Sequence, residues 1–280
     1  MTLTIGTGPF GSQPGGVFNF RVEGPAHVLY FEDCPRRVRA VFDGRAVADS
    51  RRVKLLHETG LLPVYYFPRD DVRLDLLEPS DRTTHCPFKG DASYWTLRAG
   101  DRVAEHSAWA YLDPIETAPP LAGYLAFYWD AMDAWFEEDE EVFVHPPDPY
   151  HRIDVRDSSR HVKVSLDGEA LAETDRPKLL FETGLPTRYY IPEADVRTGL
   201  LTPTETTTRC PYKGLASYWS IKAGGRVGQD LAFGKDLMWS YPAPLPEVAK
   251  IAGHLCFWNE RVDLDVDGER QPRPRTRWSP

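Results

Sequence analysis

The 280-residue sequence lacks several features that mark common classes of protein. Its four cysteines lie far apart and form no Cys-x-x-Cys pair, which argues against a zinc knuckle or a disulfide framework. No hydrophobic run approaches the roughly 18 to 20 residues of a membrane-spanning helix, and the opening MTLTIGTGPFGSQPGG does not resemble a signal peptide. We therefore expect a soluble, cytoplasmic protein with no membrane partner.

Basic residues are also in deficit. The chain has 33 lysines and arginines against 42 aspartates and glutamates, a formal net charge of −9. A general nucleic-acid binder needs a basic surface for its phosphate contacts, so this balance argues against a nucleic-acid partner. Hydrophobic residues make up 41% of the chain, which is enough for a packed core.

The sequence does contain a long internal repeat. The segment HCPFKGDASYWTL at residues 85–97 returns as RCPYKGLASYWSI at residues 209–221, an offset of 124 residues. The same offset superposes KLLHETGL on KLLFETGL. From Trp109 and Trp239 onward the offset is 130, which predicts a six-residue loop insertion between Val227 and Trp239. A period of this length indicates two homologous domains rather than a solenoid.

A proline-rich stretch separates the two repeats. Three prolines between residues 145 and 151 predict an extended, stiff linker, in which His145 and His151 are interpreted as ordinary polar residues. The predicted organisation is an N-terminal arm, a first repeat domain, the linker, a second repeat domain and a basic, proline-rich tail, at residues 1–34, 35–144, 145–151, 152–268 and 269–280.

Strand signals dominate both repeats. Asp43-Gly44 and Asp167-Gly168 each separate two short β-prone runs, which is a strong hairpin signal. The 25 prolines and 21 glycines leave little room for long helices, and only residues 68–73 and 192–197 suggest a helical turn. We predict an all-β protein in which each repeat is a compact antiparallel sheet or a small barrel.

The two CPxKGxASYW segments resemble the family of domain of unknown function 427. The Asp-Gly hairpins, the Glu-Thr-Gly-Leu segments and the Tyr-Tyr-x-Pro segments support the resemblance, which extends over most of both repeats. It implies a tent-like all-β fold, related in architecture to domains that bind small ligands or carry zinc, and the family sometimes carries a nucleotidyltransferase label. The zinc-bearing relatives use paired Cys-x-x-Cys, whereas each motif here has one cysteine, so we expect neither a metal nor another cofactor.

The CPxKGxASYW segment is the first candidate site. Proline after the cysteine and glycine after the lysine predict a tight turn that exposes the lysine, a mobile cation with three donors. Because side chains alternate along a strand, one aromatic of each Tyr-Trp pair should face the core. The cysteines are interpreted as inert thiols or, in an enzyme, as nucleophiles. The candidate residues are Cys86, Lys89, Tyr94 and Trp95 in the first repeat and Cys210, Lys213, Tyr218 and Trp219 in the second.

The segments KLLHETGL and KLLFETGL are the second candidate. On an extended segment Lys54 and Glu58 share one strand face. They could form an ion pair with each other, or meet Tyr65, Tyr66 and Lys89 around a pocket. The second repeat offers the same groups: Lys178, Glu182, Tyr189 and Tyr190.

Other motifs lack the context that their chemistry needs. GTGPFG at residues 6–11 matches GxGxxG but has no long strand before it and no helix signal after it, so an arm is the preferred interpretation. Asp263, Asp265 and Asp267 alternate with hydrophobic residues, which predicts a solvated strand face and only weakly supports a two-metal nucleotidyl-transfer site. His57 becomes Phe181 at the repeat offset and is interpreted as a partly buried packing residue.

Three functional hypotheses follow from these residues. The first is a binding module that takes a small anionic or aromatic ligand in a Lys/Glu/Tyr/Trp pocket of each repeat. The second is an enzyme with Glu58 and Glu182 as general acid–base and Lys89 and Lys213 steadying an oxyanion, nucleotidyl transfer included. The third is a protein-interaction scaffold. The sequence predicts neither the ligand nor the oligomeric state.

Overall fold

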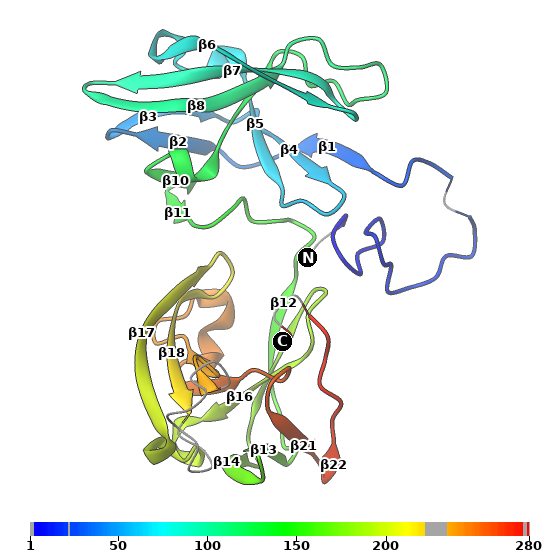
Figure 1. The fold of residues 1–280 in the computed structure, drawn as a ribbon, viewed down its shortest axis with the longest axis vertical. Helices are drawn as coiled ribbons and strands as arrows, with labels where there is room; N and C mark the ends of the chain where they lie inside the picture. Colours follow the sequence, from blue (N-terminus) through cyan, green and yellow to red (C-terminus); the bar gives the residue numbers. More distant parts are fainter. Residues whose placement is uncertain (1–2, 22, 222–233, 277–278, 280) are drawn as a thin grey trace. The chain divides into compact units, whose positions relative to one another are not determined.

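The computed structural model describes residues 3–21, 23–221, 234–276 and 279 and divides the chain into two compact units. These are Met1–Tyr150, here called domain 1, and His151–Pro280, called domain 2. Each domain holds one seven-stranded and one four-stranded antiparallel sheet, which confirms the predicted all-β, two-domain fold (Figure 1). The insertion predicted after Val227 lies largely outside the described residues. In the part of the chain that the structure describes, no helix has the length and hydrophobicity needed to cross a bilayer.

Domain 1 has the strand order β1-β4-β5-β9-β8-β7-β6 in the large sheet and β11-β10-β2-β3 in the small sheet. Short 3₁₀ helices interrupt the strands: η1 (Arg69–Asp71), η2 (Leu74–Leu76) and η3 (Trp129–Ala131). The strands are β1 (Leu29–Asp33), β2 (Val38–Phe42), β3 (Arg45–Ser50), β4 (Lys54–Glu58), β5 (Val64–Pro68), β6 (Leu77–Cys86), β7 (Gly90–Ala99), β8 (Arg102–Tyr111), β9 (Tyr124–Phe127), β10 (Ala134–Glu137) and β11 (Glu140–Val142).

Domain 2 repeats this topology, with the orders β12-β15-β16-β20-β19-β18-β17 and β14-β13-β21-β22. Its 3₁₀ helices are η4 (Glu193–Asp195), η5 (Thr198–Leu200) and η6 (Pro246–Ile251). Its strands are β12 (Ile153–Asp157), β13 (Val162–Leu166), β14 (Glu169–Thr174), β15 (Lys178–Glu182), β16 (Arg188–Pro192), β17 (Leu201–Cys210), β18 (Gly214–Ile221), β19 (Met238–Ser240), β20 (His254–Phe257), β21 (Asp263–Val266) and β22 (Glu269–Arg270).

The two Asp-Gly turns join the strands that the sequence predicts. Asp43 and Gly44 connect β2 to β3 with φ values of 52° and 68°, and Asp167 and Gly168 connect β13 to β14 with 51° and 84°. Both central residues of such a turn need a positive φ, which aspartate tolerates and glycine adopts without strain.

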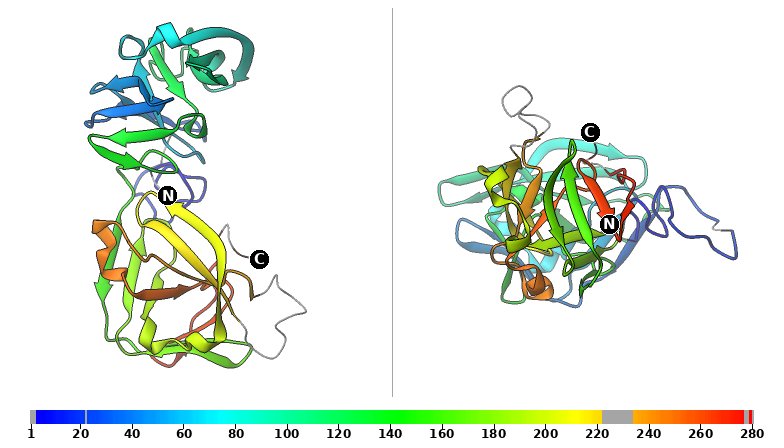
Figure 2. Two further views of the ribbon diagram at one scale, coloured as in Figure 1. Left: turned by 90° about the vertical axis from the view of Figure 1, so that its left-hand side faces the viewer. Right: turned by 90° about the horizontal axis from the view of Figure 1, so that it is seen from below.

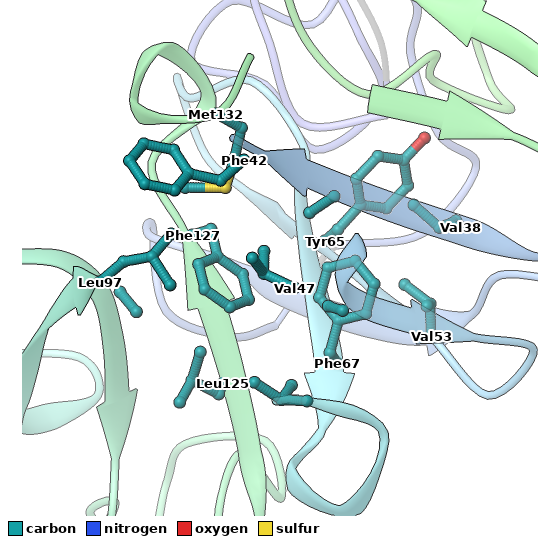
Figure 3. Close-up of a cluster of buried hydrophobic side chains, with 14 of the residues drawn as sticks. Val38, Phe42, Val47, Val53, Tyr65, Phe67, Leu97, Leu125, Phe127 and Met132 are labelled. Carbon is teal, nitrogen blue, oxygen red and sulfur yellow. The ribbon is translucent and has the colours of Figure 1, made fainter. Parts of the chain in front are cut away.

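Alternation along the strands sends neighbouring residues to different clusters. Phe67 and Val47 pack between the two sheets of domain 1 (Figure 3). Leu55 on β4 belongs to the same cluster. Leu56, its neighbour, packs on the opposite face of the large sheet. We call this second group the outer cluster; in domain 1 its buried members are Leu56, Tyr66, Ala92, Tyr94, Tyr111, Leu121 and Ala126.

Domain 2 has a matching outer cluster. Helix η6, the short orange helix in Figures 1 and 2, packs beside β12. It contributes two apolar side chains to the cluster. The buried members are Val155, Leu180, Tyr190, Ala216, Trp239, Tyr241, Val248, Ile251 and Cys256. Both candidate segments border the outer clusters.

Candidate functional site

The two candidate segments meet at a buried ion pair in each domain. Glu58 ends β4, and Lys89 lies in the turn between β6 and β7 and donates a hydrogen bond to Glu58 Oε2. In domain 2, Lys213 Nζ lies 2.5 Å from Glu182 Oε2. Each of these side chains belongs to a residue that is 7 to 9% exposed. The expectation that the turn exposes its lysine is therefore wrong, because the lysine ammonium pairs with the glutamate carboxylate inside the fold.

The loop that follows β8 holds the lysine turn in place. Ile115 N donates to Lys89 O at 3.2 Å, and in domain 2 Leu245 N donates to Lys213 O at 3.1 Å. Gly90, next to the lysine, has a φ of 99°, a conformation that side-chain-bearing residues rarely adopt. The glycine of the motif thus lets the chain reverse beneath this loop with the lysine side chain facing the sheet.

The second oxygen of each carboxylate binds a histidine. His27 Nε2 lies 2.8 Å from Glu58 Oε1, and His151 Nε2 lies 3.0 Å from Glu182 Oε1. Because a carboxylate only accepts hydrogen bonds, Nε2 of each imidazole must carry a hydrogen. Each domain therefore contains a continuous His–Glu–Lys group, in which the glutamate accepts from both neighbours.

Each histidine is fixed by contacts that recur in the two domains. Its ring stacks on the aromatic residue of the lysine turn, with centroid distances of 3.8 Å to Phe88 and 3.9 Å to Tyr212. The threonine of the Glu-Thr-Gly segment, Thr59 or Thr183, accepts a hydrogen bond at 2.9 Å from the backbone N–H that follows the histidine. The Glu-Thr pair thus binds both the imidazole and the chain that carries it.

The surroundings of Glu182 in domain 2 favour its ionised form. Burial opposes ionisation of Glu182, but the hydrogen bonds and charges of His151 and Lys213 outweigh burial and lower the pKa of Glu182 to about 2. The carboxylate is therefore ionised throughout the physiological pH range.

Tyrosines of the outer cluster lie beside the charged group. Lys89 Nζ is 5.7 Å from the centroid of the Tyr111 ring, and the Trp109 ring meets the Tyr66 ring edge-on with a centroid distance of 6.4 Å. In domain 2, Trp239 Nε1 donates to the Tyr190 hydroxyl at 3.1 Å. Desolvation raises the pKa of Tyr111, so its hydroxyl stays protonated.

Two segments of the sequence match the profile of a family described as a domain of unknown function, DUF427. The matched residues are 30–138 and 154–268. The chain belongs to the DUF427 family. It carries two DUF427 domains in tandem, and each contributes one Glu–Lys pair. No curated protein matches the sequence.

The histidines of the DUF427 domains are the residues that sequence reasoning missed. His27 lies in the segment interpreted as an arm, and His151 was interpreted as a linker residue; each precedes its matched DUF427 segment by three residues. A signal was present, because residues 27 and 151 are separated by the repeat offset of 124, as are Pro25 and Pro149. Extending the repeat comparison to the residues before Val38 aligns the two histidines.

Several predicted residues lie away from the His–Glu–Lys group. Tyr65 donates its hydroxyl hydrogen to Glu137 Oε1 at 2.6 Å on the core side of the sheet, and Lys54 pairs with Asp33 at 2.5 Å. Domain 2 shows the same division, since Lys178 pairs with Asp157 at 2.5 Å. The residues placed away from the group are Lys54, Tyr65, Trp95, Lys178, Tyr189 and Trp219.

The remaining predicted residues border the group or its outer cluster. Tyr94 and Trp95 occupy opposite faces of β7, as alternation predicts. Cys86 and Cys210 are half-buried at the start of the lysine turns, where each backbone carbonyl accepts from the lysine N–H. The residues that border the group or its outer cluster are Tyr66, Cys86, Tyr94, Tyr190, Cys210 and Tyr218.

The alternating aspartates of domain 2 are held by arginines. Arg270 Nε lies 2.9 Å from Asp265 Oδ1, and Arg273 Nη2 lies 3.0 Å from Asp263 Oδ1. Asp267 pairs with Arg160 at 2.7 Å. Among the described residues, no group of three or more His, Cys, Asp or Glu side chains is arranged to hold a metal ion.

Proposed function

We propose that each DUF427 domain of this chain binds a small molecule at its His–Glu–Lys group. The observation that carries the proposal is the repetition of this group, His27–Glu58–Lys89 and His151–Glu182–Lys213, with a buried Glu–Lys pair in both domains. Desolvating charges costs free energy, and an apolar core of the same volume is often at least as stable. Buried charged groups that border apolar surface are therefore candidates for function.

The surroundings of the group suit a small organic ligand. The outer cluster beside it combines aliphatic and aromatic side chains, such as Leu56, Tyr66 and Tyr111 in domain 1. Ligand sites in proteins commonly pair such apolar walls with a few convergent polar groups. Aromatic rings add stacking contacts beyond the area that they bury.

Native mass spectrometry of the freshly purified full chain tests this proposal. We expect additional mass corresponding to one or two copies of a small molecule per chain. Glu58→Gln should remove one copy and Glu182→Gln the other, with Asp49→Asn, on an exposed ion pair, as a control that keeps both. A chain of bare mass that also retains nothing from a desalted extract of small cellular metabolites would contradict the proposal.

A second candidate, acid–base catalysis at the same group, is favoured by the histidine geometry. Glu58 fixes the Nε2–H tautomer of His27, so a neutral imidazole presents Nδ1 as a base. If the group is catalytic, the retained molecule should change mass over time in the wild-type chain. The Glu58→Gln/Glu182→Gln variant should then abolish turnover, whereas a pure binding module should leave the molecule unaltered.

A further inference from the structure

Two bulges in the large sheet of domain 1 turn a serine and a histidine toward each other. Strands β6, β7 and β8 are neighbours in this sheet (Figure 1). On β6, residues 80–82 lie opposite the single residue Tyr94 of β7, and on β8, residues 105–107 lie opposite Thr96 alone. Bulges of this kind redirect side chains and are over-represented next to active sites.

Ser80 and His106, which the two bulges carry, share a hydrogen bond. Ser80 Oγ lies 2.6 Å from His106 Nδ1 and accepts a second bond at 3.0 Å from the backbone N–H of Arg82. In the Nε2–H tautomer, the neutral imidazole accepts the hydroxyl hydrogen of Ser80 at Nδ1. A hydroxyl bonded to a base in this way is the arrangement that activates a serine nucleophile.

The pair lines a hollow that is open to solvent. The hollow has a volume of about 420 Å³, and Ser80 and His106 are both half-buried at its wall. Its lining includes three carboxylates and one guanidinium, those of Glu78, Asp81, Glu105 and Arg98. Arg98 is already paired with Glu78 at 2.6 Å. The excess of negative charge disfavours an anionic molecule in the hollow and admits an uncharged or cationic one.

Domain 2 keeps the hydrogen bond but changes its partners. Thr204 stands at the position of Ser80 and Asp236 at that of His106, and Thr204 Oγ1 donates to Asp236 Oδ1 at 2.7 Å. His106 and Asp236 have φ values of 52° and 51°, which are uncommon for residues other than glycine. The fold therefore needs only a hydroxyl and an acceptor here, whereas domain 1 supplies an imidazole, the side chain that most often serves as a general base.

We infer that Ser80 and His106 are a nucleophile and its base, and that they cleave an uncharged or cationic ester in domain 1. His106 Nδ1 takes the hydroxyl hydrogen while Ser80 Oγ attacks the acyl carbon, and the imidazolium returns this proton to the departing alkoxide. Water, deprotonated by the same imidazole, then attacks the acyl group on Ser80. The carboxylic acid leaves and Ser80 regains its hydrogen. This activity is separate from the His–Glu–Lys group, so its failure leaves the proposed function untouched.

Mixing the full chain with 4-nitrophenyl acetate at neutral pH tests the inference, through release of nitrophenolate and peptide mass mapping. We expect release to proceed through an acetyl group on Ser80. Ser80→Ala and His106→Gln should each slow release about a hundredfold, because the nucleophile or its base is lost. The anionic ester 4-nitrophenyl succinate should react at least about tenfold more slowly than the acetate with the wild-type chain.

Two matched controls should leave release unchanged. Ser158→Ala removes another half-buried serine whose Oγ accepts from the amide two residues on, that of Arg160. His85→Gln removes an exposed histidine that is paired with Asp91.

The pair of domain 2 supplies a variant that the fold already accommodates. Ser80→Thr/His106→Asp gives domain 1 the bond that Thr204 and Asp236 form, and should abolish ester cleavage without lowering the melting temperature. Undiminished release from this variant, or acetyl groups on lysines alone, overturns the inference. Equal rates for the succinate and the acetate overturn the stated class of ester. Native mass spectrometry of the Glu58 and Glu182 variants decides the proposed function independently of these results.

Discussion

The two domains share the His–Glu–Lys group but support their aromatic residues differently. Trp109 packs on Tyr128 at 4.6 Å in domain 1, and Trp239 packs on Trp258 at 4.6 Å in domain 2. Domain 2 adds a guanidinium, since Arg188 lies 5.6 Å from the Trp239 ring and 5.2 Å from the Trp258 ring.

The arginine of domain 2 is buried and paired, whereas domain 1 has a valine in its place. Arg188 donates to both oxygens of Glu260 at 2.6 and 2.7 Å. The repeat offset of 124 places Val64 at the position of Arg188. The buried arginine of domain 2 is thus replaced by an apolar side chain in domain 1, while the His–Glu–Lys group is kept in both. The comparison distinguishes a charged residue that the fold can replace by an apolar one from the charged residues that both domains retain.

Breaking the Arg188–Glu260 ion pair should have the largest effect on the stability of domain 2 relative to domain 1. Glu260→Gln leaves the guanidinium of Arg188, at 5% exposure, without its anionic partner, which should cost domain 2 about 3 to 5 kcal/mol of unfolding free energy. Urea titration followed by hydrogen exchange of β16 measures domain 2, and exchange of β5 reports on domain 1, which should not change.

Removing both charges provides the control. Arg188→Val/Glu260→Gln introduces into domain 2 the valine that domain 1 has at this position. It should recover most of the lost stability, because no buried charge is left without a partner. A single Glu260→Gln variant within about 1 kcal/mol of wild type would show that the pair is not desolvated in solution.

The unfolding free energy of domain 2 should depend on pH with a smaller effect. The pKa of Glu182 falls from 4.5 to about 2 on folding. The stabilisation that ionised Glu182 gives to domain 2 is therefore complete above pH 4.5 and is lost as the pH falls toward 2. A shift of this size corresponds to about 3 kcal/mol. Urea unfolding between pH 2 and 7 should show the gap between wild type and Glu182→Gln narrowing through this window, and a constant gap would contradict the assignment.

The fold was largely predictable from local patterns. The Asp-Gly turns fix hairpins within a few residues of sequence, and the repeat offset carries each assignment to the second domain. Alternation also predicted that Tyr94 and Trp95 face opposite sides of β7, which the structure shows.

The site was predictable only in part, because it depends on contacts between distant strands. Lys89 and Glu58 are 31 residues apart, and the strands that flank them are not neighbours in the sheet. No local pattern states that a lysine in a tight turn will face inward. Tyr65 and Tyr66 differ by one position, and only the register of β5 decides which of them reaches the outer cluster. His27 comes from a segment with no strand pattern, so only the repeat offset could identify it.

Residue 57 gives a further comparison with the smallest expected effect. His57 is 1% exposed, and its Nε2 lies 2.8 Å from Glu32 Oε1, so its interpretation as a mere packing residue is wrong. Phe181, at the same position of domain 2, is 43% exposed. The environments of the two strands therefore differ even though the segments are nearly identical.

Exchanging these residues should be tolerated in one direction only. His57→Phe removes a buried hydrogen bond and should cost domain 1 about 1 to 2 kcal/mol, a loss limited because Glu32 keeps its bond from the Tyr150 hydroxyl at 2.8 Å. Phe181→His, on an exposed surface, should change domain 2 by less than about 0.5 kcal/mol. Urea unfolding of the two single variants measures both values, and equal costs would show that the surrounding strand, rather than the Glu32 contact, determines the preference for histidine.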